Sequence, residues 1–251
     1  MKMKLGATLL QLHCTRGNHS FLHLHHIIVR SYYGSRGSVT QLESFVRDEC
    51  KSGRIKKLDD GLKYFDQLIL ESPLPSSGTF NHVFGSLTKI KCYSDVIMLY
   101  KKLILLGVKP DIYTLSILIN CYCQLGQLNH GFCLVGEIIK RGYHPSVVTF
   151  TTLIKGLCIK GEIESAFQLF AKMTHTGIHP TAFTCDTLIH GLCRIGEVGR
   201  ALQLKNNMVK WNCRPDVVSY SAIIDTLCKG GLVDQALVLF SEMHSDSNVA
   251  D

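Results

Sequence analysis

The sequence predicts an all-α protein that is built as an α-solenoid of 35-residue helix-turn-helix repeats. Two segments that start 35 residues apart, VVTFTTLIKGLCIKGE at 147–162 and AFTCDTLIHGLCRIGE at 182–197, share the frame TLI followed by GLC and GE. Prolines keep the same spacing, at Pro75, Pro110, Pro145, Pro180 and Pro215. A fixed period of about 20–50 residues is the sequence signature of stacked repeat architectures, so the fold class follows from the period.

Units that end one residue after each proline divide most of the chain. The predicted units are 77–111, 112–146, 147–181, 182–216 and 217–251, and Ala250 stands where the last unit would have its proline. A lone helical hairpin leaves an apolar stripe uncovered, so stacking on a neighbour has to stabilise each unit. Five units exceed the minimum of about three that such arrays need.

Each unit is predicted to hold two helices that are separated by a turn. In 147–181, the first helix is indicated by apolar residues at three- and four-residue steps, at Phe150, Leu153, Ile154, Leu157 and Cys158. Gly161 then interrupts the pattern, and helices commonly end at a residue with positive φ of this kind. Neighbouring units have glycine at the same place, at Gly126, Gly196 and Gly231. The second helix carries an apolar stripe of Ile163, Ala166, Phe167, Phe170 and Met173, and Gly177 and Pro180 end it.

Residues 43–76 are predicted to form a degenerate N-terminal repeat that caps the array. The run SGRIKKLDDGLKYFDQLILESPLP is typical of a second helix, with apolar residues at helical spacing at Leu58, Leu62, Phe65, Leu68 and Ile69. Gly53 lies 22 residues before Pro75, whereas this distance is 19 in the later units. We therefore expect a three-residue insertion in this unit.

Residues 1–42 have the composition of an organellar transit peptide. They hold five Lys or Arg and no acidic residue, and they lack the single continuous apolar core of a secretory signal. The mitochondrion is the favoured destination, and the chloroplast is the alternative. His23, His25 and His26 could take a metal, but polar filler is the favoured interpretation because we expect the segment to be cleaved, and no metal site is predicted.

The net charge of +7 comes mostly from this first segment, because residues 43–251 hold 22 basic and 20 acidic residues. The charge therefore does not identify a partner by itself. No stretch approaches the ~18 apolar residues that a membrane helix needs, so no membrane contact is expected. No nucleophile and base lie at a readable spacing, and the H-x-E and P-C-x-x-C stretches of zinc deaminases are missing. We expect no enzyme activity, no cofactor and no small-molecule substrate.

The 11 cysteines are odd in number and include no C-x-x-C pair, so reduced thiols are expected rather than a disulfide framework. Four of them repeat every 35 residues, at Cys123, Cys158, Cys193 and Cys228. One cysteine per unit is too widely spaced for a tetrahedral zinc site. We expect each of the four to behave as a small buried hydrophobic residue.

The period and the residue pattern together resemble the pentatricopeptide repeat family in its plain, P-class form. The match is carried by VVTFTTLIKGLCIKGEIESAFQLFAKMTHTGIHPT at 147–181 and VVSYSAIIDTLCKGGLVDQALVLFSEM at 217–243. Tetratricopeptide repeats have a tryptophan-based signature, whereas the single tryptophan here, Trp211, falls in a connecting turn. The N-terminal segment and runs such as TLIKGLC are similar to the plant fertility-restorer-like subgroup. The resemblance implies a right-handed superhelix that binds single-stranded organellar RNA, one base per repeat.

The resemblance also implies that the fifth and last residues of each unit read a base, with the second residue as a wall against it. The implied fifth residues are Asn81, Ser116, Thr151, Asp186 and Ser221. The implied last residues are Asp111, Ser146, Thr181, Asp216 and Asp251. The implied wall residues are Tyr113, Val148, Phe183 and Val218, and Gly78 departs from this pattern in the first unit. The implied role is post-transcriptional RNA processing or stability, with RNA-processing proteins as candidate further partners.

The residue types support part of this implication on physical grounds. Short polar side chains suit the hydrogen-bonding edge of a base, and an apolar neighbour can stack on the base, worth about 1–3 kcal/mol. Helix capping is an alternative for the last residues, because Asp, Ser and Thr before an apolar run are ordinary N-caps. The fifth residues are poor helix formers, so we expect them to face solvent or a ligand.

The family's pairing preferences imply a footprint of the form uracil, purine, purine, any base, guanine, read 5′ to 3′ along the chain. Asn81 with Asp111 implies uracil, and Ser221 with Asp251 implies guanine. The serine pair and the threonine pair imply a purine with weak discrimination. Asp186 with Asp216 departs from the usual pattern, and two acids near one base would also repel backbone phosphate, so this unit is expected to read poorly. A protein-binding helical scaffold without RNA is the alternative function, which the nearly neutral repeats allow.

Overall fold

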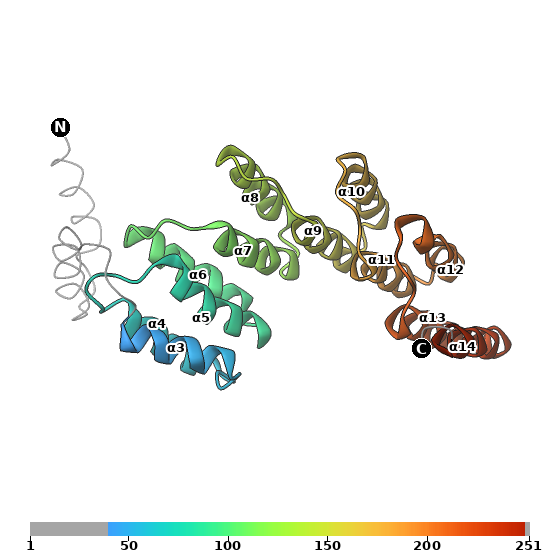
Figure 1. The fold of residues 1–251 in the computed structure, drawn as a ribbon, viewed down its shortest axis with the longest axis horizontal. Coiled ribbons are helices and arrows are strands. Elements are labelled where there is room, and N and C mark those ends of the chain that lie inside the picture. The colour runs from blue at the N-terminus through green and yellow to red at the C-terminus, as the bar shows by residue number, and fades with distance from the viewer. Residues whose placement is uncertain (1–39, 249–251) are drawn as a thin grey trace, which may run out of the picture.

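The computed structural model describes residues 40–248, where helices are joined by short turns (Figure 1). Residues 1–39 of the predicted transit peptide, with its three histidines, and Asp251 lie outside this range. The helices are α3 (Gln41–Lys51), α4 (Leu58–Leu68), α5 (Ser77–Lys89), α6 (Tyr93–Leu105), α7 (Ile112–Gln124), α8 (Leu128–Lys140), α9 (Val147–Lys160), α10 (Ile163–His175), α11 (Ala182–Arg194), α12 (Val198–Asn207), α13 (Val217–Lys229) and α14 (Val233–Asn248). The prediction of an all-α solenoid is confirmed, and no helix within 40–248 is long and apolar enough to cross a membrane.

Successive helices pair as hairpins around a repeated turn. Between α9 and α10, Gly161 has a φ of 82°, and the backbone N–H of Glu162 donates to the carbonyl of Leu157 (2.9 Å), which closes α9 in a Schellman-type turn. Lys91 takes the place of this glycine between α5 and α6, with a φ of 64°. The predicted apolar faces of α9 and α10 are confirmed: Phe150 and Phe167 are half-buried, and the other residues of both stripes are buried.

The N-terminal hairpin of α3 and α4 differs from the others in its turn. α4 starts five residues after Gly53, whereas α10 starts two residues after Gly161, which places the three-residue insertion in the turn. Phe65, Leu68 and Ile69 of the predicted second helix are buried. α3 begins at Gln41 with Thr40 as its N-cap, so the predicted boundary after residue 42 falls inside a helix.

The first helices of the hairpins stack into one continuous row, in the order α3, α5, α7, α9, α11 and α13. In Figure 1, α8 and α10 project on the same side of this row. Each second helix from α4 to α12 also contacts the first helix of the next hairpin. The core passes from one hairpin to the next, since α7 contributes Leu115 to one buried cluster and Leu118 to another. Burial between neighbours is what stabilises such an array.

Glycine and cysteine meet where first helices pack closely. Gly156 of α9 lies against Cys123 of α7, and a methyl group at Gly156 would come within 2.8 Å of the Cys123 sulfur. Gly191 of α11 meets Cys158 of α9 in the same way, at 2.6 Å. Burial raises the pKa of the Cys123 thiol to about 12 and that of Cys158 to about 11.

The prediction that all four repeated cysteines are buried is wrong for Cys193 and Cys228. Cys193 is half-buried, and the residue that stands opposite it is Thr226, which hydrogen-bonds its thiol, where the preceding contacts have glycine. Cys228 is exposed, because within 40–248 no further first helix packs on α13. Burial of this column therefore depends on the residue that the next hairpin places against it.

Candidate nucleic-acid interface

Large apolar side chains are exposed on the first turns of neighbouring helices. The exposed fractions are 72% for Tyr113, 63% for Val148, 64% for Phe183 and 50% for Val218. Each is the second residue of its helix, in α7, α9, α11 and α13 respectively. Because these helices stack in one row, the four side chains recur once per hairpin. Such a row offers a stacking surface to a chain of flat rings.

The predicted last residues within the described range cap the same helices. Asp111 accepts from the backbone N–H of Thr114 (2.8 Å), Ser146 from that of Thr149 (3.4 Å), Thr181 from that of Thr184 (3.4 Å) and Asp216 from that of Ser219 (3.2 Å). The capping role that was considered as an alternative is therefore present at all four. Ser146, Thr181 and Asp216 are exposed and Asp111 is half-buried, so these side chains stay accessible beside the apolar row.

The predicted fifth residues differ in their exposure. Ser221 is exposed, and Asn81 and Ser116 are half-buried. The expectation that fifth residues face solvent or a ligand is wrong for Thr151 and Asp186, which are 4% and 5% exposed. Each of these two is hydrogen-bonded to a hydroxyl of the next hairpin. In their units the exposed Thr181 and Asp216 are more accessible to a ligand than the fifth residue.

Buried hydroxyls link the fifth residues to the next hairpin, and the sequence reasoning missed them. Thr114 donates to Oδ1 of Asn81 (2.8 Å), the hydroxyls of Thr151 and Thr184 are hydrogen-bonded at 2.9 Å, and Ser219 donates to Asp186. Thr79 donates to Glu43 of the N-terminal hairpin in the same manner. The signal in the sequence is a hydroxyl residue at the third position of every unit, at Thr79, Thr114, Thr149, Thr184 and Ser219.

Asn81 and Asp111 are joined directly. Nδ2 of Asn81 donates to both carboxylate oxygens of Asp111, at 2.9 and 3.1 Å, and the Ser77 hydroxyl donates to the same carboxylate (2.9 Å). Burial alone would raise the pKa of Asp111, but hydrogen bonds from the Thr114 backbone, Asn81 and Ser77 together lower it. Asp111 is therefore held as a carboxylate, which can only accept hydrogen bonds.

Asp186 and Asp216 behave differently. Burial raises the pKa of Asp186, and the nearby charge of Asp216 raises it further against the opposing hydrogen bond from Ser219. The ionised form of Asp186 is thus disfavoured where that of Asp111 is favoured. Two predicted readers of the same residue type therefore have opposite electrostatic surroundings.

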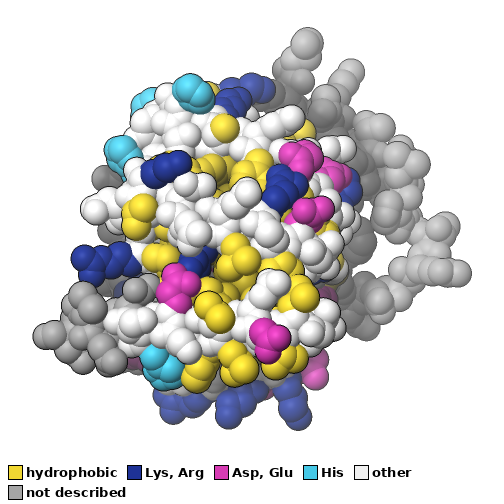
Figure 2. Space-filling view, turned by 90° about the vertical axis from the view of Figure 1, so that its right-hand side faces the viewer, with side chains coloured by type: hydrophobic (Ala, Val, Ile, Leu, Met, Phe, Trp, Pro, Cys, Tyr) yellow, Lys and Arg dark blue, Asp and Glu magenta, His cyan; other side chains and the backbone are white. Residues whose placement is uncertain are grey.

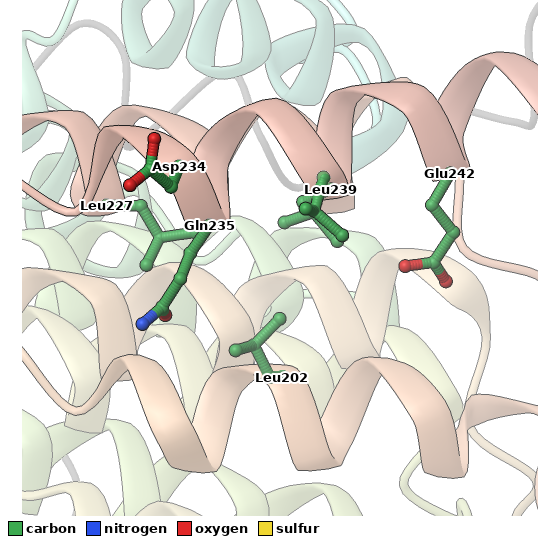
Figure 3. Close-up of a pocket in the computed structure, with 7 residues that line it drawn as sticks. Leu202, Leu227, Asp234, Gln235, Leu239 and Glu242 are labelled. Carbon is green, nitrogen blue, oxygen red and sulfur yellow. The ribbon is translucent and has the colours of Figure 1, made fainter.

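A cavity of about 360 Å³ lies between α12 and α14, apart from the predicted readers. In Figure 3, Leu202 points from α12 toward α14, which contributes Gln235, Leu239 and Glu242. Figure 2 views the end of the array that holds α13 and α14, where hydrophobic side chains gather. Exposed apolar residues of α14 include Leu237, Val238 and Phe240. No group of His, Cys, Asp and Glu within 40–248 could hold a metal ion.

Stacked hairpins with capped first helices define the chain as a helical-repeat protein of the α-solenoid class. The PPR repeat family model matches residues 75–124, 116–159, 145–194 and 180–229, and the PPR repeat model matches residues 218–247. The chain belongs to the pentatricopeptide repeat family.

Similar curated proteins include mitochondrial pentatricopeptide repeat-containing proteins of Arabidopsis thaliana. One is 35% identical over 86 residues, which cover 34% of this chain and 16% of the relative. Another is 36% identical over 84 residues, which cover 33% of this chain and 17% of the relative. The match thus spans about a sixth of the length of these relatives.

Solved structures share the fold. The pentatricopeptide repeat protein PPR10 in complex with an 18-nt psaJ RNA element matches 88% of this chain and 36% of its own, with a TM-score of 0.66 and 21% identity. The PPR domain of Arabidopsis thaliana protein-only RNase P 1 in complex with tRNA matches 67% of this chain and 89% of its own, with a TM-score of 0.52 and 20% identity. At these identities the likeness shows the α-solenoid fold.

Proposed function

We propose that this chain binds single-stranded RNA with sequence selectivity and serves RNA processing or stability in an organelle. The observation that carries the proposal is the row of exposed wall residues, each two positions after a polar N-cap. A base that stacks on the wall residue brings its hydrogen-bonding edge near that polar group. PPR10 bound to an RNA element and a repeat domain bound to tRNA, both with the same fold, support RNA as the ligand class.

One nucleotide is assigned to each unit from 77–111 to 217–251. Asn81 with Asp111 is assigned uracil, as the family's pairing preferences imply. The serine and threonine pairs of the next two units are assigned purines, and Ser221 with Asp251 is assigned guanine, although Asp251 lies outside the described residues. The full proposed footprint is uracil, purine, purine, any base, guanine.

Unit 182–216 is proposed to contribute little base selectivity. Its fifth residue, Asp186, is 5% exposed and its carboxyl is engaged by Ser219, so a base meets chiefly Asp216 and the Phe183 ring. Stacking on Phe183 is tolerant of sequence because every base has a flat face. This supports the assignment of any base at the fourth position.

The mitochondrion is the proposed site of action, with the chloroplast as the alternative. The composition of residues 1–42 and the mitochondrial names of the relatives support this assignment. The 35-residue period supports the P class, and assignment to the fertility-restorer-like subgroup remains a proposal. The proposed action is binding without catalysis, cofactor or small-molecule substrate.

Fluorescence anisotropy with the full chain tests the function. We expect tighter binding to the footprint RNA than to an RNA of the same composition in shuffled order, with an affinity that falls steeply as salt rises. Equal affinities for the two RNAs would remove the claim of selectivity. Binding to neither RNA would favour a protein-binding scaffold.

A matched pair of variants tests the wall. Phe183→Ala removes a stacking ring that is 64% exposed, so we expect RNA binding to weaken by about 1–3 kcal/mol. Phe45→Ala removes a ring that is 52% exposed on α3, which carries no predicted wall residue, so its RNA affinity should equal that of the parent. Equal losses in both variants would contradict a stacking role for Phe183.

A further inference from the structure

The third residue of each unit has a hydroxyl that is buried at the start of a first helix. Thr79, Thr114, Thr149, Thr184 and Ser219 are at most 5% exposed. The hydroxyls of Thr114, Thr149 and Thr184 each accept a hydrogen bond, at 3.2–3.3 Å, from the backbone N–H of the N-cap residue of their own helix. This is a capping box with threonine in the place that Glu or Gln ordinarily takes. Because a hydroxyl has a proton to donate besides its lone pairs, capping leaves the donor free.

The free donor is directed at the preceding hairpin. Thr114 donates to Oδ1 of Asn81 (2.8 Å), and Ser219 donates to Oδ1 of Asp186. The hydroxyls of Thr184 and Thr151 are hydrogen-bonded across the same interface. The hydroxyls of Thr114, Thr184 and Ser219 therefore each contact the fifth residue of the unit before their own.

Asn81 is held from two sides by these contacts. Its Nδ2 donates to Asp111, and its Oδ1 accepts from Thr114, which fixes the donor and acceptor ends of the amide. The Thr114 hydroxyl also lies 2.9 Å from Oδ1 of Asp111, so it contacts both predicted readers of unit 77–111. One N–H and one lone pair of the amide remain for a base. Without the Thr114 hydroxyl, Asp111 alone would orient the amide.

Unit 112–146 lacks this arrangement and serves as an internal control. Ser116 donates instead to the carbonyl of Ile112 in its own helix (2.8 Å). The Thr149 hydroxyl lies 3.3 Å from the Ser146 hydroxyl, and among the described contacts it does not reach Ser116. Removing this hydroxyl deletes a buried polar group without releasing a fifth residue.

We propose that Thr114 is a positioning residue that sets the base preference of Asn81 and Asp111, and that Thr184 does the same for Thr151. The proposal rests on the RNA-binding function proposed above. It makes the readout of one base depend on two adjacent units, because the reader belongs to one unit and the group that orients it belongs to the next.

The test measures the affinity of the full chain for four RNAs that differ only in the nucleotide aligned with unit 77–111. The parent chain should prefer uracil. Thr114→Val keeps the shape and branching of the side chain but removes the hydroxyl, so the preference should fall about fivefold, the effect of one neutral hydrogen bond. Thr114→Ser restores the hydroxyl and should restore the preference. Thr149→Val removes the equivalent hydroxyl one unit further along, which contacts Ser146 and not Asn81 or Asp111, so it should leave the uracil preference at the parent level.

The outcomes separate the two proposals. A parent chain without any uracil preference overturns the proposed function. The positioning role is overturned if the parent prefers uracil and a folded Thr114→Val variant keeps that preference. It is also overturned if Thr149→Val loses as much of the uracil preference as Thr114→Val does. Thermal unfolding by circular dichroism reports whether each variant is folded. If Thr114→Val does not fold, Thr184→Val tests the equivalent contact between Thr184 and Thr151. Unchanged base selectivity at the nucleotide aligned with unit 147–181 then overturns the proposal.

Discussion

The ammonium group of Lys205 lies 2.5 Å from a carboxylate oxygen of Glu242, which joins α12 to α14 across the last two hairpins. The side chain of Lys205 is only 3% exposed, whereas that of Glu242 is 47% exposed. The Lys205 ammonium also lies 4.8 Å from the centre of the Tyr220 ring. Removing Glu242 would therefore leave a buried charge without a partner, whereas removing Lys205 would leave a charge that water can solvate.

Removing the acid is expected to destabilise the C-terminal hairpins more than removing both charges. Glu242→Gln leaves the buried ammonium of Lys205 without its counter-charge, at a cost of about 1–3 kcal/mol. Lys205→Met with Glu242→Gln replaces the ion pair by groups of similar volume, which is often nearly neutral. Urea denaturation followed by circular dichroism measures both. The interpretation fails if the double variant is as unstable as Glu242→Gln alone.

Close packing of first helices is expected to make two glycines sensitive to a single methyl group. Gly156→Ala and Gly191→Ala would place a methyl group within 2.9 Å of a cysteine side chain. Both variants should therefore lower the free energy of unfolding by about 1–3 kcal/mol, which urea denaturation measures. Gly136 and Gly199 are also helical but have nothing within 4 Å of the added carbon. Alanine at these two positions should raise stability by up to about 1 kcal/mol. Destabilisation in all four variants would argue against a packing cause.

The turn between α5 and α6 is expected to improve when it receives glycine. Lys91 has a φ of 64°, a conformation that costs a non-glycine residue about 1–2 kcal/mol. Lys91→Gly removes this strain but increases the entropy of the unfolded chain, so a net gain of about 0.5–1 kcal/mol is expected. Lys63→Gly, at an exposed position inside α4, should cost about 1 kcal/mol. Thermal midpoints that move in the same direction in both variants would refute the explanation.

The repeating part of the fold could be predicted because the residues that end its helices act through local backbone preferences. Gly161 and Gly177 follow the ends of α9 and α10 with positive φ, a conformation that glycine adopts readily, so a 35-residue period in such residues sets the helix limits. The N-terminal insertion could be counted from Gly53 and Pro75. Its place in the turn became clear only once the start of α4 at Leu58 was known.

The surroundings of the predicted readers could not be deduced from the sequence. Thr151 and Asp186 are buried because Thr184 and Ser219, each 33 residues later, meet them across an interface between hairpins. The sequence shows the residue types, but the partner of each depends on how two hairpins are aligned. The surroundings of Cys193 could not be deduced for the same reason, since Thr226, which hydrogen-bonds its thiol, belongs to the following hairpin.

Asp111 and Asp186 are expected to respond to pH in opposite directions. The folded pKa of Asp186 lies above the ordinary value of 3.8, so its contribution favours folding below that value and is lost as pH rises through the raised pKa. The folded pKa of Asp111 lies below 3.8, so its contribution is present above that value and is lost as pH falls through the lowered pKa. Asp186 therefore weakens the fold at neutral pH, and Asp111 strengthens it.

Asparagine variants isolate this difference because the amide keeps the hydrogen-bond acceptor. Asp186→Asn should unfold at a higher temperature than the parent at neutral pH, and Asp111→Asn, which remains a good N-cap, should unfold at a lower one. Both differences should shrink as the pH is lowered through the titration of each group. Thermal unfolding of both variants and the parent across a pH series measures the effect. If both variants move the unfolding temperature in the same direction at neutral pH, the pKa values of Asp111 and Asp186 are not shifted in opposite directions.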